Sequence, residues 1–199
     1  MTESTKDRAA TIRKTLKDDY GWSSRAVSVR TDYFSMGSSI DVEIKDPTVN
    51  YAVVEAVANE AQSIRRCEIS GDILNGGNRY VSVKYSDEAE KALAAPYIAP
   101  LQAAMDRCEP GSNTLEPVAG NVLVGITGVG GFQLWTDRAG MNFGSRPEDG
   151  AFYVARYIED AKPAPKPGDF KKKTESAKAK PVTLTPVARQ SQTLTLRIV

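Results

Sequence analysis

The side chains most often used in catalysis are sparse in this chain, because its 199 residues include two cysteines and no histidine. Histidine is the usual general base at neutral pH and the commonest metal ligand in proteins. Its absence excludes Ser/His/Asp triads, Cys/His dyads and zinc sites that use histidine. Cys67 and Cys108 lie too far apart for a CxxC motif, so we interpret them as buried small hydrophobes or bystanders. We therefore expect no enzyme, no bound metal and no cofactor.

Two other patterns could support chemistry, and both have simpler interpretations. The two carboxylates of a catalytic pair must be buried and must point toward one another, and spacing in the sequence shows neither property. The pairs in this sequence are Asp18 with Asp19, Asp41 with Glu43, and Glu148 with Asp149. Asp41 and Glu43 alternate with apolar residues and should face water. The glycines from Gly125 to Gly131 match neither the P-loop spacing nor the dinucleotide-binding spacing, so they predict a hairpin turn.

One predicted strand offers a candidate binding surface. Tyr80 and Lys84 alternate onto the same strand face, and we expect Arg30 of an earlier strand to share that face. An exposed aromatic and basic sheet surface can stack bases and hold phosphates. Ordinary cross-strand packing explains the same residues, and both interpretations stay open at this point.

Charge is distributed unevenly along the chain. Residues 1–160 carry 17 Lys and Arg against 23 Asp and Glu, a net charge of −6, whereas residues 161–199 carry nine against two, a net charge of +7. We expect any electrostatic attraction for nucleic acid or an acidic partner to lie in the C-terminal part, and to involve Lys171, Lys172 and Lys173. A solubilising tail that binds nothing is the alternative.

Hydrophobic periodicity predicts the elements that must position these side chains. In chain order we expect helix, strand, strand, helix and strand over residues 4–20, 26–31, 39–44, 47–65 and 79–85. Asp46 and Pro47 are expected to cap and begin the second helix. This order predicts an α+β fold, with a small antiparallel or mixed sheet covered by both helices on one face.

The remaining sequence predicts a second, smaller part and a tail. A helix capped by Ser86 should be interrupted by Pro96 and Pro100 and end near Cys108. Turn signals between apolar runs predict a hairpin or small meander over about 121–144, followed by a short helix over 148–159. The expected parts are an α+β domain at 1–109, a β-hairpin plus helix at 110–160, and an extended tail rich in proline and lysine at 161–199.

The end of the tail alternates in the manner of a strand. Within Thr193–Val199, the residues Leu194, Leu196 and Ile198 fall on one face. Such a segment can add to the edge of another sheet, so we expect these three side chains to dock on a neighbouring subunit if the protein self-associates.

The first part resembles a known family. Ser28-Val-Arg begins the resemblance, the hairpin Tyr33–Thr48 with its Ser-Met-Gly-Ser turn continues it, and Asn78-Arg-Tyr-Val-Ser-Val follows the next helix. Over about residues 8–86 the chain resembles a small α+β domain of the large polyvalent protein-associated class, found in proteins of phages, plasmids and other mobile elements. This sequence has Ile44 where the family has tryptophan, and no glycine before Pro47. The resemblance implies a genomic setting and no catalytic residues.

These observations predict a phage or mobile-element accessory protein that binds nucleic acid or a host protein complex, for example to inhibit a host defence. The alternative is a structural virion or assembly protein whose tail docks on neighbouring subunits. The first residues lack the pattern of a secretory signal, and no apolar run reaches the length of a membrane span. We therefore expect the protein in the cytoplasm of a host cell, or in the virion, and without a membrane partner.

Overall fold

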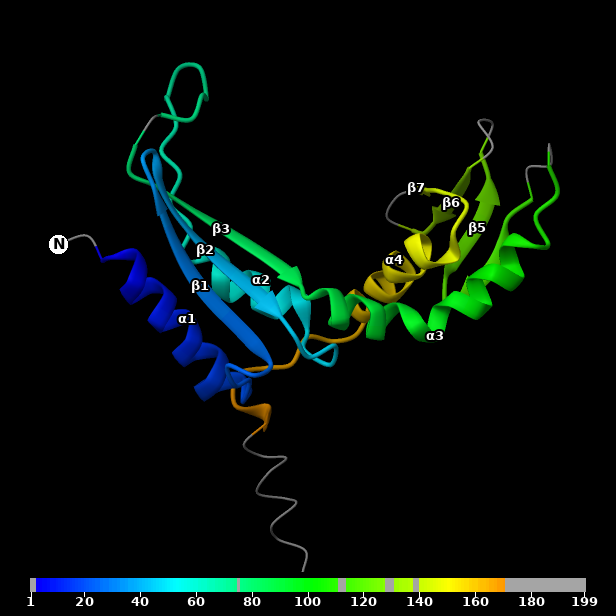
Figure 1. Ribbon diagram of the computed structural model, residues 1–199, viewed down its shortest axis with the longest axis horizontal. Coiled ribbons are helices and arrows are strands. Elements are labelled where there is room, and N and C mark those ends of the chain that lie inside the picture. Colours follow the sequence, from blue (N-terminus) through cyan, green and yellow to red (C-terminus); the bar gives the residue numbers. More distant parts are fainter. Residues whose placement is uncertain (1–2, 75, 111–113, 128–130, 138–139, 171–199) are drawn as a thin grey trace, which may run out of the picture.

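The first half of the chain forms a three-stranded sheet with two helices (Figure 1). The computed structural model describes residues 3–74, 76–110, 114–127, 131–137 and 140–170. Strands β1 (Val27–Phe34) and β2 (Gly37–Ile44) are antiparallel, and β3 (Asn78–Tyr85) pairs parallel to β2. Helices α1 (Thr5–Tyr20) and α2 (Tyr51–Asn59) pack on one face, which confirms the predicted α+β layer and its mixed sheet.

The core of this half follows from the two periodicities read in the sequence. The inward side chains of the strands are those at alternate positions, and the helices contribute residues three or four apart. All are removed from water, which is the main favourable term in folding. The buried set includes Ala9, Ile12, Leu16, Val27, Val29, Ile40, Val42, Ile44, Val54 and Ala58.

Strands β1 and β2 are longer than the sequence predicted. Only Ser35 and Met36 lie between them, because Phe34 already pairs with Gly37. Two-residue connections are the commonest between antiparallel strands. Phe34 is therefore the last residue of the outward-facing row of β1.

The second helix is shorter than predicted. The Asp46 carboxylate accepts hydrogen bonds from the backbone N–H and the hydroxyl of Thr48, at 2.9 and 2.7 Å, so it stabilises a turn and not the helix. Asn50 is the true N-cap, since its side chain accepts from the N–H of Val53 at 3.0 Å. Residues 60–74 form turns and isolated bridges in place of the expected helix end.

Helix α3 (Asp87–Met105) is continuous, so the interruption predicted at Pro96 and Pro100 is wrong. Ser86 is its N-cap, as predicted. Each proline removes one N–H donor from the helix. Packing offsets this cost because α3 contacts two cores: Leu93 lies in the first, and Leu101 lies in the second.

The second core lies between α3, helix α4 (Pro147–Asp160) and a four-stranded antiparallel meander. The meander contains β4 (Glu116–Ala119), β5 (Val122–Ile126), β6 (Phe132–Trp135) and β7 (Gly140–Phe143). The antiparallel pairing of β5 with β6 confirms the predicted hairpin, whose turn residues 128–130 lie outside the described residues. The last helix is confirmed, while β4 was missed because it is short and contains a proline. Since α3 belongs to both cores, the expected boundary at residue 109 does not separate them.

Residues 162–170 were expected in an extended tail without a core, but they run back to the end of α1 (Figure 1). There the N–H of Gly168 donates to the carbonyl of Asp19 at 2.6 Å. Among the residues that the structure describes, no helix has the length and apolar character needed to cross a membrane.

Candidate functional site: the open sheet face and its hairpin end

The face of the first sheet opposite α1 and α2 carries the predicted binding residues. Strand pairing places Ser28, Glu43 and Lys84 in one row across the sheet, and Arg30, Asp41 and Ser82 in the next. Asp32, Ser39 and Tyr80 form a third row. The prediction that Arg30, Tyr80 and Lys84 share a face is therefore confirmed.

This face is not the basic surface that the sequence predicted. Arg30 lies directly opposite Asp41 in the β1–β2 register, and Lys84 lies opposite Glu43 in the β2–β3 register. Asp32 adds a third carboxylate, so the face has two basic and three acidic side chains. Carboxylates at this density repel a phosphate backbone, because both carry negative charge.

An aromatic pair marks one end of the face. The rings of Phe34 and Tyr80 stack with centroids 6.1 Å apart and an interplanar angle of 27°. Phe34 is nevertheless 45% exposed, since none of the helices in the described part of the chain covers this side of the sheet. Sequence reasoning missed Phe34 because it was assigned to the turn.

Further large apolar side chains are exposed at the same end. The turn between β1 and β2 and the loop preceding β3 both project there, beyond the ends of the strands (Figure 1). Isolated exposed hydrophobes are ordinary, but clusters of them mark interaction sites. We call the following set, which lies at this end of the sheet with Tyr33 on the helix side of β1 and Phe34 on the open side, the hairpin-end surface: Tyr33, Phe34, Met36, Ile69, Ile73 and Leu74, whose exposed fractions run from 39% to 97%.

Buried Asn78 fixes the loop to the sheet. Its side-chain oxygen accepts from the N–H of Arg65 at 2.9 Å, and its amide donates to the carbonyl of Leu74 at 2.7 Å. Gly37 lies beside it on β2, where a Cβ atom would be 2.3 Å from the Asn78 carbonyl oxygen. Only glycine allows the two strands to approach this closely.

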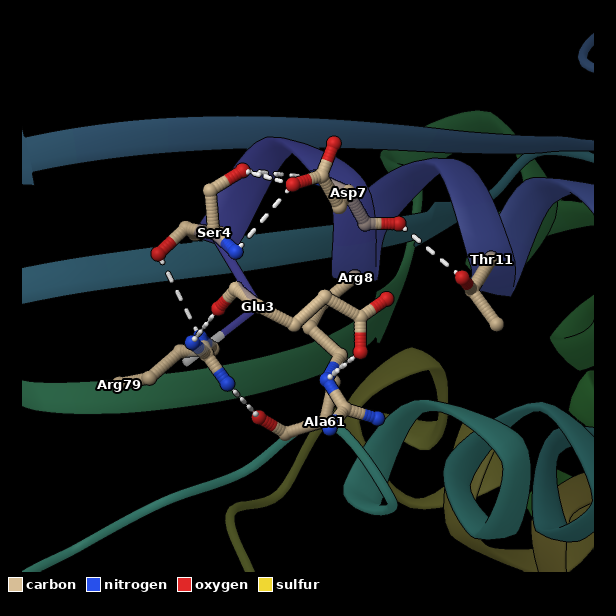
Figure 2. Close-up of polar contacts among 8 residues, drawn as sticks. Glu3, Ser4, Asp7, Arg8, Thr11, Ala61 and Arg79 are labelled. Atoms are coloured by element: carbon tan, nitrogen blue, oxygen red, sulfur yellow. Dashed lines mark hydrogen bonds and ion pairs between the residues drawn. The ribbon is translucent and has the colours of Figure 1, made fainter. Parts of the chain in front are cut away.

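Arg79 ties the base of the same loop to α1 and α2 (Figure 2). Its guanidinium donates to the Ala61 carbonyl at 3.1 Å, to the Glu3 carbonyl at 2.9 Å and to the Thr5 hydroxyl at 3.3 Å. The Thr5 hydroxyl also shares a hydrogen bond of 2.8 Å with Ser38. These contacts join segments far apart in sequence, so the hairpin-end surface has a fixed base.

The two cysteines differ in environment. Cys67 lies in the loop of the hairpin-end surface, where hydrogen bonds from the Ser70 side chain and from the backbone of Ser70 and Ile69 lower its thiol pKa to about 7. Cys108 is buried, as predicted, and burial raises the pKa of its thiol. Cys67 is partly exposed, so the buried alternative of the prediction holds for Cys108 and not for Cys67.

The carboxylate pairs of the sequence form no buried site. Asp41 is exposed and Glu43 partly exposed, as predicted for the outward face of a strand. The other two pairs also retain contact with water at Asp18, Asp19, Glu148 and Asp149. Within the described ranges, no three Cys, Asp or Glu side chains are arranged to hold a metal ion.

The remaining predicted site residues lie outside the described residues: Lys171, Lys172, Lys173, Leu194, Leu196 and Ile198. The structure thus places Arg30, Tyr80 and Lys84 on one face, and adds Phe34, whose ring stacks on that of Tyr80. In comparisons with known proteins, no family model matches this chain, and neither does any curated protein or solved structure.

Proposed function

We propose that this chain is a phage or mobile-element accessory protein that acts by binding a host protein complex, and not by catalysis. The genomic setting rests on the resemblance of about residues 8–86 to the mobile-element domain described above. The activity that fits such a protein is inhibition of a host defence, in the cytoplasm of the host cell. The binding surface is the hairpin-end surface.

The observation that carries this proposal is the exposure of six large apolar side chains on a fixed base. Protein interfaces are enriched in aromatic residues and methionine, and a few such anchors supply most of the binding energy. Phe34 and Met36 are 45% and 51% exposed at the hairpin turn, and Ile69 is 97% exposed on the neighbouring loop. Contacts of Asn78 and Arg79 order this surface before binding, which lowers the entropic cost of association.

The charge of the sheet face favours a protein over nucleic acid at this site. A base stacked on Phe34 or Tyr80 would bring its phosphate toward Asp32, which shares a row with Tyr80, and toward Asp41 in the next row. A protein partner with an apolar pocket and a mixed polar rim meets no such repulsion. Arg30 and Lys84 then belong to that polar rim.

Affinity capture from a host-cell extract tests the proposal with two matched pairs of substitutions. Phe34→Ser with Met36→Ser removes two anchors of the hairpin-end surface, and Trp135→Ser with Met141→Ser removes two side chains of similar exposure on the meander. We expect proteins captured by the wild-type chain to be lost with the first pair and retained with the second. Equal capture by both variants would exclude this surface.

A second candidate function is nucleic-acid binding through the C-terminal basic residues, favoured by the net charge of +7 over residues 161–199. Affinity should then fall steeply with salt, with a log–log slope of about −0.9 per phosphate neutralised on duplex DNA. Charge reversal at Lys171, Lys172 and Lys173 should weaken binding. An affinity that changes neither with salt concentration nor with these substitutions would exclude this function.

Assembly into a virion or another structure is the alternative, favoured by the alternation of Thr193–Val199. Backbone pairing would supply affinity, while Leu194, Leu196 and Ile198 would fill pockets on a neighbouring subunit. Deletion of residues 193–199 should then dissolve the oligomer measured by light scattering. A chain that never exceeds the mass of a dimer, with or without these residues, argues against this alternative.

A further inference from the structure

Residues 162–170, which we call the strap, connect the end of α4 to the end of α1 (Figure 1). Lys162 pairs with Glu159 at 2.6 Å where the strap begins. At its other end, the N–H of Gly168 donates to the Asp19 carbonyl, and the Phe170 ring lies against Gly21. Gly21 is left-handed with φ +74°, and a Cβ atom there would be 2.7 Å from the Phe170 ring.

The strap crosses a groove with an aromatic wall. Tyr20 and Trp22 stack with ring centroids 5.1 Å apart and an interplanar angle of 16°. Pro47, Thr48 and Asn50, from the turn between β2 and α2, form the opposite side. Together with the strap these residues line an open groove with a volume of about 570 Å³.

The strap has the chemistry of a ligand for such a groove. Its sequence Pro163-Ala-Pro165-Lys-Pro167 places proline at every second position. Proline-rich segments favour the extended polyproline II conformation and dock on aromatic-lined grooves at low entropic cost. Pro165 and Phe170 are partly buried here, while Pro163 and Pro167 remain exposed.

The strap therefore occupies the groove without filling it. Its anchoring contacts lie at its two ends, whereas the open volume of the groove lies beside its central prolines. The acidic side chain of Glu159 lines the groove and already pairs with a lysine of the strap. Once the strap has left, another segment with prolines and a lysine would meet both the aromatic faces and the Glu159 carboxylate.

We propose that the groove formed by Tyr20, Trp22 and Pro47 is a binding site for a proline-rich segment of a partner protein, which the strap occupies in cis. This second interaction surface lies at the opposite end of α1 from the hairpin-end surface and does not depend on it. Release of the strap opens the site, because the tethered segment competes with any segment in trans at an effective concentration of about millimolar.

The test uses the full chain and a fluorescein-labelled peptide with the sequence of residues 161–170. The double substitution Pro165→Ser with Phe170→Ser releases the strap. Fluorescence anisotropy should show that the peptide binds this variant at least about tenfold more tightly than it binds the wild-type chain, because the wild-type strap competes in cis. Tyr20→Ser in the released background should weaken binding, and Pro47→Ala provides a second groove variant. Trp135→Ser, on the meander, is the control and should change nothing.

The two tryptophans allow the site to be located by NMR. The peptide should shift the indole resonance of Trp22 and leave that of Trp135 in place, in a spectrum whose dispersion shows that the variant is folded. An unmoved Trp22 resonance, or equal binding of a peptide with its prolines replaced by alanine, would overturn the proposal. The proposal would also be overturned if the wild-type chain were a dimer that Phe170→Ser dissolves, because the groove would then bind the strap of a second copy.

Discussion

The stacked rings of Phe34 and Tyr80, 6.1 Å apart, join the last residue of β1 to the third residue of β3, two strands away in the sheet. Both rings lie on the face of the sheet opposite α1 and α2, and Phe34 remains 45% exposed. An aromatic pair held in this way suits the anchor role that we propose for it. Substitution of either ring should affect the proposed binding more than the stability of the fold, because neither ring belongs to the first core.

Replacement of Phe34 by alanine should therefore leave the fold nearly intact. The lost ring contact is worth about 0.5–1.5 kcal/mol, so we expect the free energy of unfolding in urea to fall by about 1 kcal/mol. Ile40→Ala, at a fully buried position of β2, should cost about 2–5 kcal/mol. A loss at Phe34 as large as that at Ile40 would show that Phe34 is a core residue.

Gly37→Ala should disrupt the junction of β2 and β3. The new Cβ atom would be 2.3 Å from the Asn78 carbonyl oxygen, and backbone atoms cannot yield as a flexible side chain would. Overpacking of this kind costs about 1–3 kcal/mol. Hydrogen exchange should accelerate at amides of residues 63–74, whereas Ser39→Ala on the same strand should leave their exchange unchanged.

Arg79→Ala should loosen the base of the hairpin-end surface. Three hydrogen bonds from its guanidinium are lost, and bonds from charged groups contribute about 1.5–3 kcal/mol each in favourable cases. Because Arg79 is partly buried, we expect a total loss of about 2–3 kcal/mol in urea unfolding. Arg79→Lys should restore only part of it, since one ammonium group does not span three acceptors. Full recovery with lysine would contradict this geometry.

Cys67 should react with iodoacetamide in a strongly pH-dependent way. The thiolate is the reactive form, and hydrogen bonds centred on Ser70 lower the Cys67 pKa to about 7, so the rate should reach half its maximum near pH 7. Ser70→Ala should move this midpoint upward. Mass spectrometry of the modified peptide measures both. A wild-type midpoint near the ordinary cysteine value of about 8.5, unchanged in the variant, would contradict the prediction.

Strand alternation was enough to predict that Arg30, Tyr80 and Lys84 share a face, because side-chain direction has a fixed period of two. The net charge of that face could not be predicted in the same way. Asp41 and Glu43 were expected to face water but were not counted with Arg30 and Lys84, and Asp32 lay beyond the predicted end of its strand at residue 31. The pairing of Arg30 with Asp41 follows from the length of a turn that the sequence left open. The parallel pairing of β3 with β2 likewise places Lys84 opposite Glu43.

The hairpin-end surface was missed for a related reason. Residues 66–77 lie between the predicted helix at 47–65 and the predicted strand at 79–85 and were assigned to neither, so nothing local indicates where Ile69 or Leu74 lies. Their position is set by contacts of Asn78 and by bonds of Arg79 that reach Thr5, 74 residues earlier in the chain. Likewise, Pro96 and Pro100 predict an interruption locally, but packing against two cores keeps α3 continuous.

Photo-cross-linking in host cells tests the central claim most directly. A benzophenone amino acid replaces Met36 on the hairpin-end surface or, as the matched control, Met141 on the meander; the two side chains are 51% and 43% exposed. We predict a discrete cross-linked protein adduct from position 36, abolished when Phe34 is changed to serine, and none from position 141. Adducts from position 141 alone, or adducts from position 36 that persist with Phe34→Ser, would contradict the assignment of the hairpin-end surface as the binding site.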